Sequence, residues 1–197
     1  LRRRGCGLTL ITDSLAGAQA IIDFGRQHDE TFAVMIEIDC DGHRSGVKPH
    51  DPLLLDIARL LGDTLTGVLT HAGESYGLDT PEALQAIAEQ ERARCVEAAA
   101  RIRAAGLPCA QVSVGSTPTA LSAVNLEGVT ELRAGVYAFF DLVMHNIGVC
   151  RTDELALSVL TTVIGHQAEK GWIITDAGWM AMSRDRGTQS QKKDFGY

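Results

Sequence analysis

A regular alternation of short apolar strands with helices is the feature that most constrains the fold of this chain. Each apolar run of strand length is followed by a helix-start signal, such as Asp51-Pro52 or Thr80-Pro81-Glu82, and then by apolar residues at helical spacing. We expect strands at residues 8–12, 32–39, 65–70, 110–114, 129–133 and 137–140, and helices at 13–26, 51–62, 81–106 and from 116. This β-α order predicts an α/β layer or barrel with mainly parallel strands.

The pattern changes towards the end of the chain. A β-rich run from Leu155 to Ile164 precedes a second one from Trp172 to Thr175, with only a short connection between them. This spacing suits antiparallel pairing, because parallel strands need a longer crossover. We therefore expect a barrel-type domain over residues 1–148 and the start of a β-rich domain over residues 149–197.

The composition excludes several classes of protein. The net charge is −7 and Arg2-Arg3-Arg4 is the only basic run, so we expect no nucleic-acid partner. No apolar run reaches the roughly 18 residues of a membrane helix, so we expect no membrane partner. The 5 cysteines are scattered and contain no Cys-x-x-Cys pair, which favours a cytoplasmic location. Because the chain begins with Leu1, we expect a piece of a longer protein.

One strand end has the residues of an anion site. The strand at 110–114 stops at Gly115, where the backbone can approach a ligand closely. Ser116 or Thr117 can cap the next helix, and Pro118 suits its first position. The N-terminus of such a helix favours a phosphate, although a strand–turn–helix junction without a ligand fits the same residues.

A second glycine junction follows the strand at 129–133. Gly135 again permits a close approach of the backbone, and Val136 follows it. In α/β barrels the phosphate site is often built from the loops after the last two strands. The two junctions together therefore favour phosphate binding.

Other polar side chains also follow strands. His71 could stack on a planar ligand, act as a base or be a core histidine, and Tyr76 could donate its hydroxyl or pack. Arg44 could contact an anion or a cofactor ring, or form a salt bridge within a turn. A metal cluster of Asp39, Asp41 and His43 is a further alternative.

Five motifs in order resemble the D-serine dehydratase and D-threonine aldolase family. They are Glu37-Ile38-Asp39 with Gly42-His43-Arg44-Ser45-Gly46-Val47, Thr70-His71-Ala72-Gly73 with Tyr76, Gly115-Ser116-Thr117-Pro118-Thr119, Glu131-Leu132-Arg133-Ala134-Gly135-Val136-Tyr137, and Asp176-Ala177-Gly178 with Ser183-Arg184-Asp185. These are fold-type III enzymes that use pyridoxal 5'-phosphate (PLP) and are related to alanine racemase. The resemblance implies an incomplete alanine racemase-like (β/α)8 barrel followed by the start of a β-rich domain.

The resemblance also implies the roles of particular residues toward PLP. Thr117, with Ser116 beside it, would bind the phosphate, and Gly135 and Val136 would offer it backbone N–H groups. Tyr76 would hydrogen-bond the cofactor. His71 would lie against the pyridine ring, and Arg44 would sit near the ring nitrogen or the polar edge of the cofactor.

Two parts of the family site have no match in this chain. The family's Schiff-base lysine lies on the first barrel strand, and none of Lys48, Lys170, Lys192 and Lys193 matches that position. The ligands of the family's divalent metal, zinc or manganese, are expected beyond the last residue. We therefore assign no catalytic and no metal-binding residue within the chain.

The function expected from the resemblance is that of a PLP-dependent lyase. Its substrate would be a small D-amino acid, its reaction a dehydration or an aldol cleavage, and its assembly a homodimer. The alternatives are an amino-acid racemase or non-catalytic PLP-binding protein of the same barrel, and an inactive remnant or interaction module.

Overall fold

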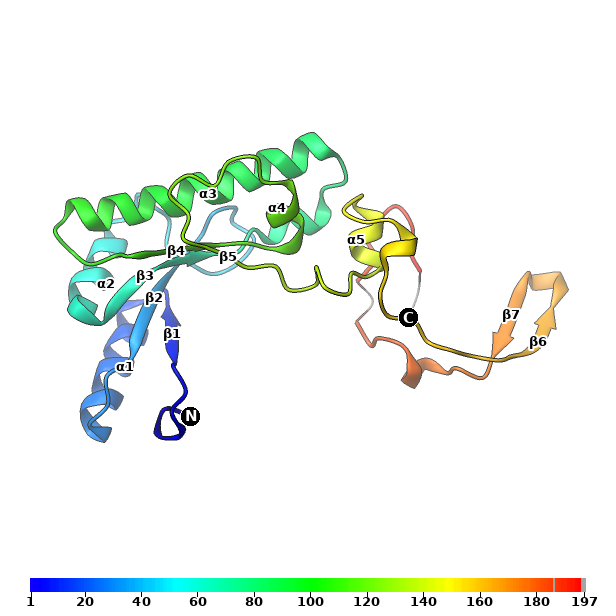
Figure 1. The fold of residues 1–197 in the computed structure, drawn as a ribbon, viewed down its shortest axis with the longest axis horizontal. Coiled ribbons are helices and arrows are strands. Elements are labelled where there is room, and N and C mark those ends of the chain that lie inside the picture. The colour runs from blue at the N-terminus through cyan, green and yellow to red at the C-terminus, as the bar shows by residue number, and fades with distance from the viewer. Residues whose placement is uncertain (186, 196–197) are drawn as a thin grey trace. The chain divides into compact units, whose positions relative to one another are not determined.

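A computed structural model describes residues 1–185 and 187–195, which divide into two compact units (Figure 1). The first unit is Leu1–Gly135, and the second begins at Val136. Within the described part of the chain, no helix has the length and apolar character needed to cross a membrane.

A five-stranded parallel sheet forms the centre of the first unit. Its strands are β1 (Thr9–Thr12), β2 (Ala33–Ile38), β3 (Leu65–Thr70), β4 (Gln111–Val114) and β5 (Glu131–Leu132). They lie in the order β1-β2-β3-β4-β5, and every neighbouring pair is parallel. This sequential order is that of a β/α barrel, in which the carboxyl ends of all strands meet at one edge. The α/β prediction is therefore confirmed.

The helices of the first unit begin where polar caps stand in the sequence. They are α1 (Leu15–His28), α2 (Pro52–Leu61), α3 (Pro81–Ala104) and α4 (Thr117–Ser122). Ser14, Asp51, Thr80 and Ser116 each accept a hydrogen bond from a backbone N–H in the first turn. Such caps satisfy N–H groups that have no partner within the helix.

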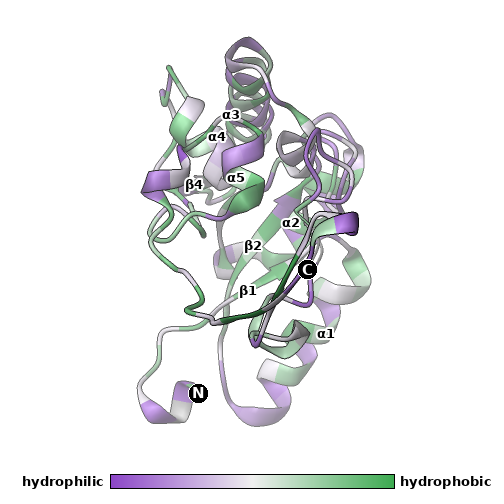
Figure 2. Cartoon of the chain, turned by 90° about the vertical axis from the view of Figure 1, so that its right-hand side faces the viewer, coloured by the Kyte–Doolittle hydropathy of each residue, from purple (hydrophilic) through white to green (hydrophobic). Residues whose placement is uncertain are grey.

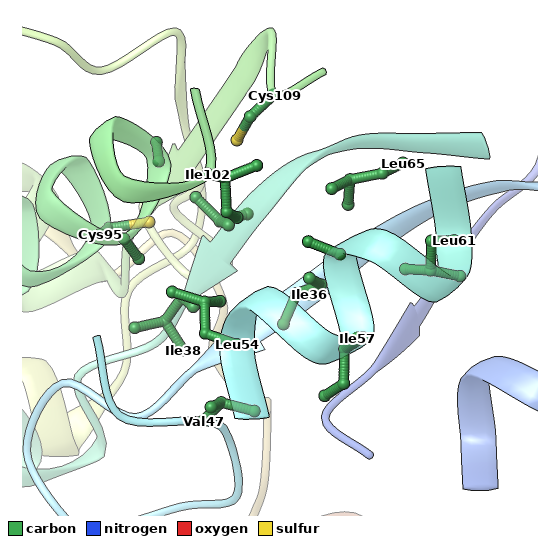
Figure 3. Close-up of a cluster of buried hydrophobic side chains, with 14 of the residues drawn as sticks. Ile36, Ile38, Val47, Leu54, Ile57, Leu61, Leu65, Cys95, Ile102 and Cys109 are labelled. Carbon is green, nitrogen blue, oxygen red and sulfur yellow. The ribbon is translucent and has the colours of Figure 1, made fainter. Parts of the chain in front are cut away.

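The core lies between the sheet and two of these helices (Figure 3). Ile36 and Ile38 of β2 pack with Leu54 and Ile57 of α2, and Ile102 of α3 joins the same buried cluster. Figure 2 shows β2 mostly in the hydrophobic colour. Because side chains alternate along a strand, the residues between these, such as Glu37, lie on the opposite face of the sheet.

The second unit contains a short helix and a hairpin. Helix α5 (Leu142–Asn146) is capped by Asp141, whose carboxylate accepts the Met144 N–H at 2.9 Å. Strands β6 (Val163–Gln167) and β7 (Trp172–Thr175) pair antiparallel, as predicted.

One predicted strand in this unit is wrong, and a second is found only in part. Residues 137–140 form a turn, in which the N–H groups of Phe139 and Phe140 donate to the Val136 carbonyl and Phe140 has a φ of 52°. The run at 155–164 is extended into a paired strand only from Val163, so β6 starts later and ends later than expected. The boundary expected between residues 148 and 149 stays a prediction.

Candidate functional site

The ends of three neighbouring strands bring His71, Gly115 and Arg133 to one edge of the sheet. His71 follows β3, Gly115 follows β4, and Arg133 follows β5. The pairing of β3 with β4 and of β4 with β5 is parallel, so these three positions are neighbours in space.

Gly115 is required by the close approach of the next strand. Its φ is +135°, and a Cβ there would collide with the backbone of Arg133. The Arg133 N–H donates to the carbonyl of Val114 at 2.8 Å, which continues the ladder past the end of β5. Gly115 was expected to let the backbone approach a ligand closely, and the neighbour that approaches it closely in the structure is the backbone of Arg133.

His71 has one nitrogen bonded and the other unpartnered. Its Nδ1 lies 3.0 Å from the carbonyl oxygen of Gly115. A carbonyl only accepts, so in the neutral ring the proton is on Nδ1 and Nε2 carries a lone pair. Nε2 is buried and has no hydrogen-bond partner among the described residues. A buried polar atom without a partner is a candidate ligand contact.

The surroundings of His71 favour its neutral form. Burial lowers the pKa of the imidazole, and the positive charges of Arg44 and Arg133 lower it further, while the bond to Gly115 acts in the opposite direction. The Tyr76 ring is nearly parallel to the His71 ring, with 5.9 Å between centroids. The two rings that were predicted to contact one ligand thus lie together.

The hydroxyls of the Ser116–Thr119 turn bond to one another. Ser116 and Thr119 form a capping box, with 3.0 Å between the two hydroxyl oxygens. The Ser116 hydroxyl also lies 2.9 Å from that of Ser75, which donates to the Ala72 carbonyl. Ser116 and Thr117 are buried at the predicted junction, and their role in phosphate binding stays a prediction.

Arg44 lies in the loop after β2, and that loop packs on the loop after β3. A Cβ on Gly73 would lie 2.8 Å from the His43 ring and 3.4 Å from Cγ of Arg44. The Glu74 N–H donates to the carboxylate of Asp41 at 2.9 Å. Arg44 is exposed, and its charge acts on His71.

The metal alternative for the same loop is wrong. Asp39 accepts the N–H groups of Asp41 and Gly42, and Asp41 accepts that of His43. These bonds belong to a tight turn. Across residues 1–185 and 187–195, no three His, Cys, Asp or Glu side chains come together as metal ligands.

The second glycine junction is reached from β5. A Cβ on Gly135 would meet no atom within 4 Å, so there is open space beside this residue. Val136 begins the second unit. The contact of Gly135 and Val136 with a phosphate stays a prediction.

Two charged residues of the site carried no prediction. Arg133 donates from Nε to the Ser113 hydroxyl at 2.9 Å and from its guanidinium to the Thr70 carbonyl. Glu91 is 2% exposed and bonds to the loops after β3 and β4. Its signal in the sequence was a carboxylate on the apolar face of α3, between Ile87 and Cys95. The signal of Arg133 was its position directly after a strand.

Comparison with known proteins shows the family to which the chain belongs. The alanine racemase N-terminal domain family matches residues 2–143. This chain belongs to that family. The putative serine dehydratase domain matches residues 156–197, so the resemblance inferred from the sequence motifs is confirmed over both parts of the chain.

Individual members of this family are similar to the chain over its whole length or most of it. D-threo-3-hydroxyaspartate dehydratase of Delftia sp. (strain HT23) is 72% identical over 201 residues, and its structure matches with a TM-score of 0.94, covering 100% of this chain and 53% of that one. D-serine dehydratase of Dictyostelium discoideum is 26% identical over 91% of this chain and 49% of its own length.

A third likeness concerns the fold alone. D-threonine aldolase of Filomicrobium marinum is 21% identical, with a TM-score of 0.70 over 86% of this chain and 47% of that one. The alanine racemase-like fold is therefore confirmed. This chain spans about half the length of the curated dehydratases it matches.

Proposed function

We propose that the whole protein is a PLP-dependent lyase that dehydrates a small D-3-hydroxy amino acid. The observation that carries this proposal is the 72% identity of the entire chain to a D-threo-3-hydroxyaspartate dehydratase. Because of this identity, we propose D-threo-3-hydroxyaspartate as the substrate. D-serine and D-threonine are the alternatives, from relatives named D-serine dehydratase and D-threonine aldolase.

The chemistry of the residues present fits PLP. The buried, unpartnered Nε2 of His71 is an acceptor at the point where the resemblance places the pyridine ring. Tyr76 lies beside it, and Arg44 supplies a positive charge to the same region. We propose that Ser116, Thr117, Gly135 and Val136 hold the phosphate. When bound, PLP supplies an electron sink for the carbanion formed at the substrate Cα.

The chain's own groups would orient and desolvate that site. With its proton on Nδ1, where the Gly115 carbonyl accepts it, His71 would present an uncharged ring to the cofactor. The hydroxyls of Ser75, Ser116 and Thr119 form a connected buried network. This network keeps the Ser116–Thr119 turn, the proposed phosphate loop, in one arrangement. Within this chain we assign no catalytic residue.

The proposed reaction of the whole protein removes water and then ammonia. The Cα proton and the Cβ hydroxyl leave as water, and hydrolysis of the resulting imine releases ammonia and a 2-oxo acid. We propose that a divalent metal, zinc or manganese, assists departure of the hydroxyl in the whole protein. A cysteine-to-alanine mutant of D-threo-3-hydroxyaspartate dehydratase has a structure in a metal-free form, which supports this.

We also propose a cytoplasmic protein that acts without a nucleic-acid or membrane partner and assembles as a homodimer. The cysteines Cys6, Cys40, Cys95, Cys109 and Cys150 are all free thiols. Free thiols are the usual state in a reducing compartment.

A product assay on the purified whole protein tests the proposal. With D-threo-3-hydroxyaspartate we expect ammonia and oxaloacetate in equal amounts, and loss of activity after chelation that added zinc or manganese restores. Glycine with an aldehyde would instead identify an aldolase, and an inverted amino acid a racemase. The absence of PLP from the protein, with no turnover after PLP is added, would overturn the proposal.

A further inference from the structure

A buried carboxylate joins the two loops of the proposed cofactor site from behind. Glu91 lies on α3, on the face that also carries the buried Ile87, Ala88 and Cys95. Its side chain is almost completely buried, with 2% of the residue exposed. Burying a carboxylate is costly unless it is well hydrogen-bonded, so the partners of Glu91 indicate its structural role.

One oxygen of this carboxylate serves both loops. Oε1 of Glu91 accepts the N–H of Ala72 at 2.9 Å and the N–H of Gly115 at 3.1 Å. Ala72 directly follows His71, and Gly115 directly precedes Ser116. The carboxylate therefore bonds to the backbone beside the imidazole and to the backbone beside the phosphate loop.

These bonds close a ring through His71. The carbonyl of Gly115 accepts from Nδ1 of His71, while its N–H donates to Glu91. The Ala72 carbonyl accepts from Ser75, whose hydroxyl also contacts that of Ser116 in the loop after β4. The N–H and carbonyl groups of Ala72 and Gly115 are thus all hydrogen-bonded, and Glu91 is the α3 side chain that accepts from both loops.

Burial and hydrogen bonding act on Glu91 in opposite directions. Burial raises the pKa of the carboxyl, whereas hydrogen bonds from Thr119, Ala72 and Gly115 lower it. Its function in the ring needs only an oxygen that accepts. An amide in place of the carboxylate keeps such an oxygen, and an alkyl group of similar size does not.

We propose that Glu91 is a positioning residue, which holds the loop after β3 against the loop after β4 so that His71 and the Ser116–Thr117 turn face the cofactor together. This inference rests on the proposed function, because it assigns Glu91 a role toward PLP. It adds a residue outside the strand ends to that site.

Three substitutions in the whole protein test it. Glu91→Gln keeps the acceptor, Glu91→Asp shortens the side chain by one methylene, and Glu91→Leu removes the acceptor while filling similar space. Glu89→Leu removes a half-exposed carboxylate of α3 that pairs with Arg92, and serves as the matched surface control. Leu54→Ala, in a core cluster separate from the one that contains Ala72, controls for lost stability.

Two measurements separate positioning from stability. The first is the Kd for PLP of the apo-protein, from quenching of intrinsic fluorescence; the second is the ¹⁵N shift of the His71 ring, which reports whether Nδ1 carries the proton. We expect Glu91→Leu to weaken PLP binding by about tenfold or more, Glu91→Asp by less, and Glu91→Gln by under about threefold. Glu91→Leu should also mix the His71 tautomers, while Leu54→Ala and Glu89→Leu leave both readouts unchanged.

The outcomes distinguish this inference from the proposed function. Wild-type PLP affinity and unchanged His71 signals in Glu91→Leu, or in Glu91→Asp if the leucine variant does not fold, would overturn the role of Glu91. A loss of affinity in Leu54→Ala equal to that in Glu91→Leu would also overturn it. If the wild-type protein binds no PLP, the proposed function fails, and the His71 signals still test whether Glu91 orients the ring.

Discussion

Nδ1 of His71 lies 3.0 Å from the carbonyl oxygen of Gly115, so a histidine after one strand is held by the glycine after the next. Forty-four residues separate the two in the chain. Because β3 and β4 pair in parallel, the residues that follow the two strands are neighbours in space. The bond determines which ring nitrogen is protonated and leaves Nε2 as the buried acceptor of the site.

His71 should titrate below the ordinary histidine pKa of 6.5, because burial and the charge of Arg44 disfavour its cationic form. Below pH 6.5 the unfolded chain binds a proton that the folded state does not. Stability should therefore fall as the pH drops from 6.5 towards the lower pKa of the folded state. NMR titration of the ring gives the pKa, and urea unfolding across this range gives the stability.

His71→Asn is the matched variant for this effect, since its amide can still donate to Gly115 but does not titrate. The pH-dependent loss of stability should be smaller in this variant. A ring that titrates above 6.5 in the wild-type protein would contradict the expectation.

Gly115→Ala should destabilise the fold, because the new Cβ would meet the backbone of Arg133 and φ is +135°. The backbone conformation alone costs about 1–3 kcal/mol for a residue other than glycine. Chemical denaturation of the whole protein measures the loss. Gly77→Ala is the control, since a Cβ there meets nothing within 4 Å and φ is not in the left-handed region. Equal losses of stability in both variants would show that the contact with Arg133 is not the cause.

Arg133→Leu should lower the free energy of unfolding by about 1–2 kcal/mol, because the Ser113 hydroxyl and the Thr70 carbonyl lose their donor. Arg133→Lys should recover only part of this, since an ammonium lacks the planar fork that reaches both acceptors. Arg26→Leu removes an exposed arginine paired at 3.9 Å with Asp23 and should change stability by under about 0.5 kcal/mol. Urea unfolding compares the three variants. An effect of Arg133→Leu no larger than that of Arg26→Leu would show that the bonds of Arg133 to Ser113 and Thr70 do not stabilise the fold.

The buried thiols should resist alkylation in the folded protein. Burial raises the pKa of Cys40 to about 12, and burial also raises the pKa of Cys95. Only the thiolate reacts, and Cys6 is exposed. Iodoacetamide near pH 8, followed by peptide mapping, should label Cys6 first and the other two only in denaturant. Equal labelling of Cys40 and Cys6 in the native state would disprove the packing around β2.

The local elements of the fold were predictable because their signals lie within a few residues. Ser14, Asp51 and Thr80 cap helices where the sequence places them. The two differences from the expected strands have separate causes. Phe140 takes a left-handed conformation that ends the apolar run at 137–140 as a turn. The Asp176 carboxylate accepts from Thr161 and Thr162, and the Asp176 N–H donates to the Thr162 carbonyl, so the hairpin is closed at this point and the paired strand starts only at Val163.

The candidate site was only partly predictable for a different reason. His71 and Gly115 could be singled out, since each follows an apolar strand. Arg133 and Glu91 could not, because a charged residue becomes part of the site only through its partners. Sequence spacing contains no information on those partners.

The sequence by itself determined the β-α order, the helix starts, the glycine junctions and the family, because each depends on neighbouring residues or on motif order. Only the tertiary structure decided that the proton of His71 sits on Nδ1 and that Glu91 joins two loops. It also showed that Gly115 is required by Arg133. These relationships arise from the register of parallel strands and the packing of α3 on them, which bring groups together over distances of 18 to 44 residues in the chain.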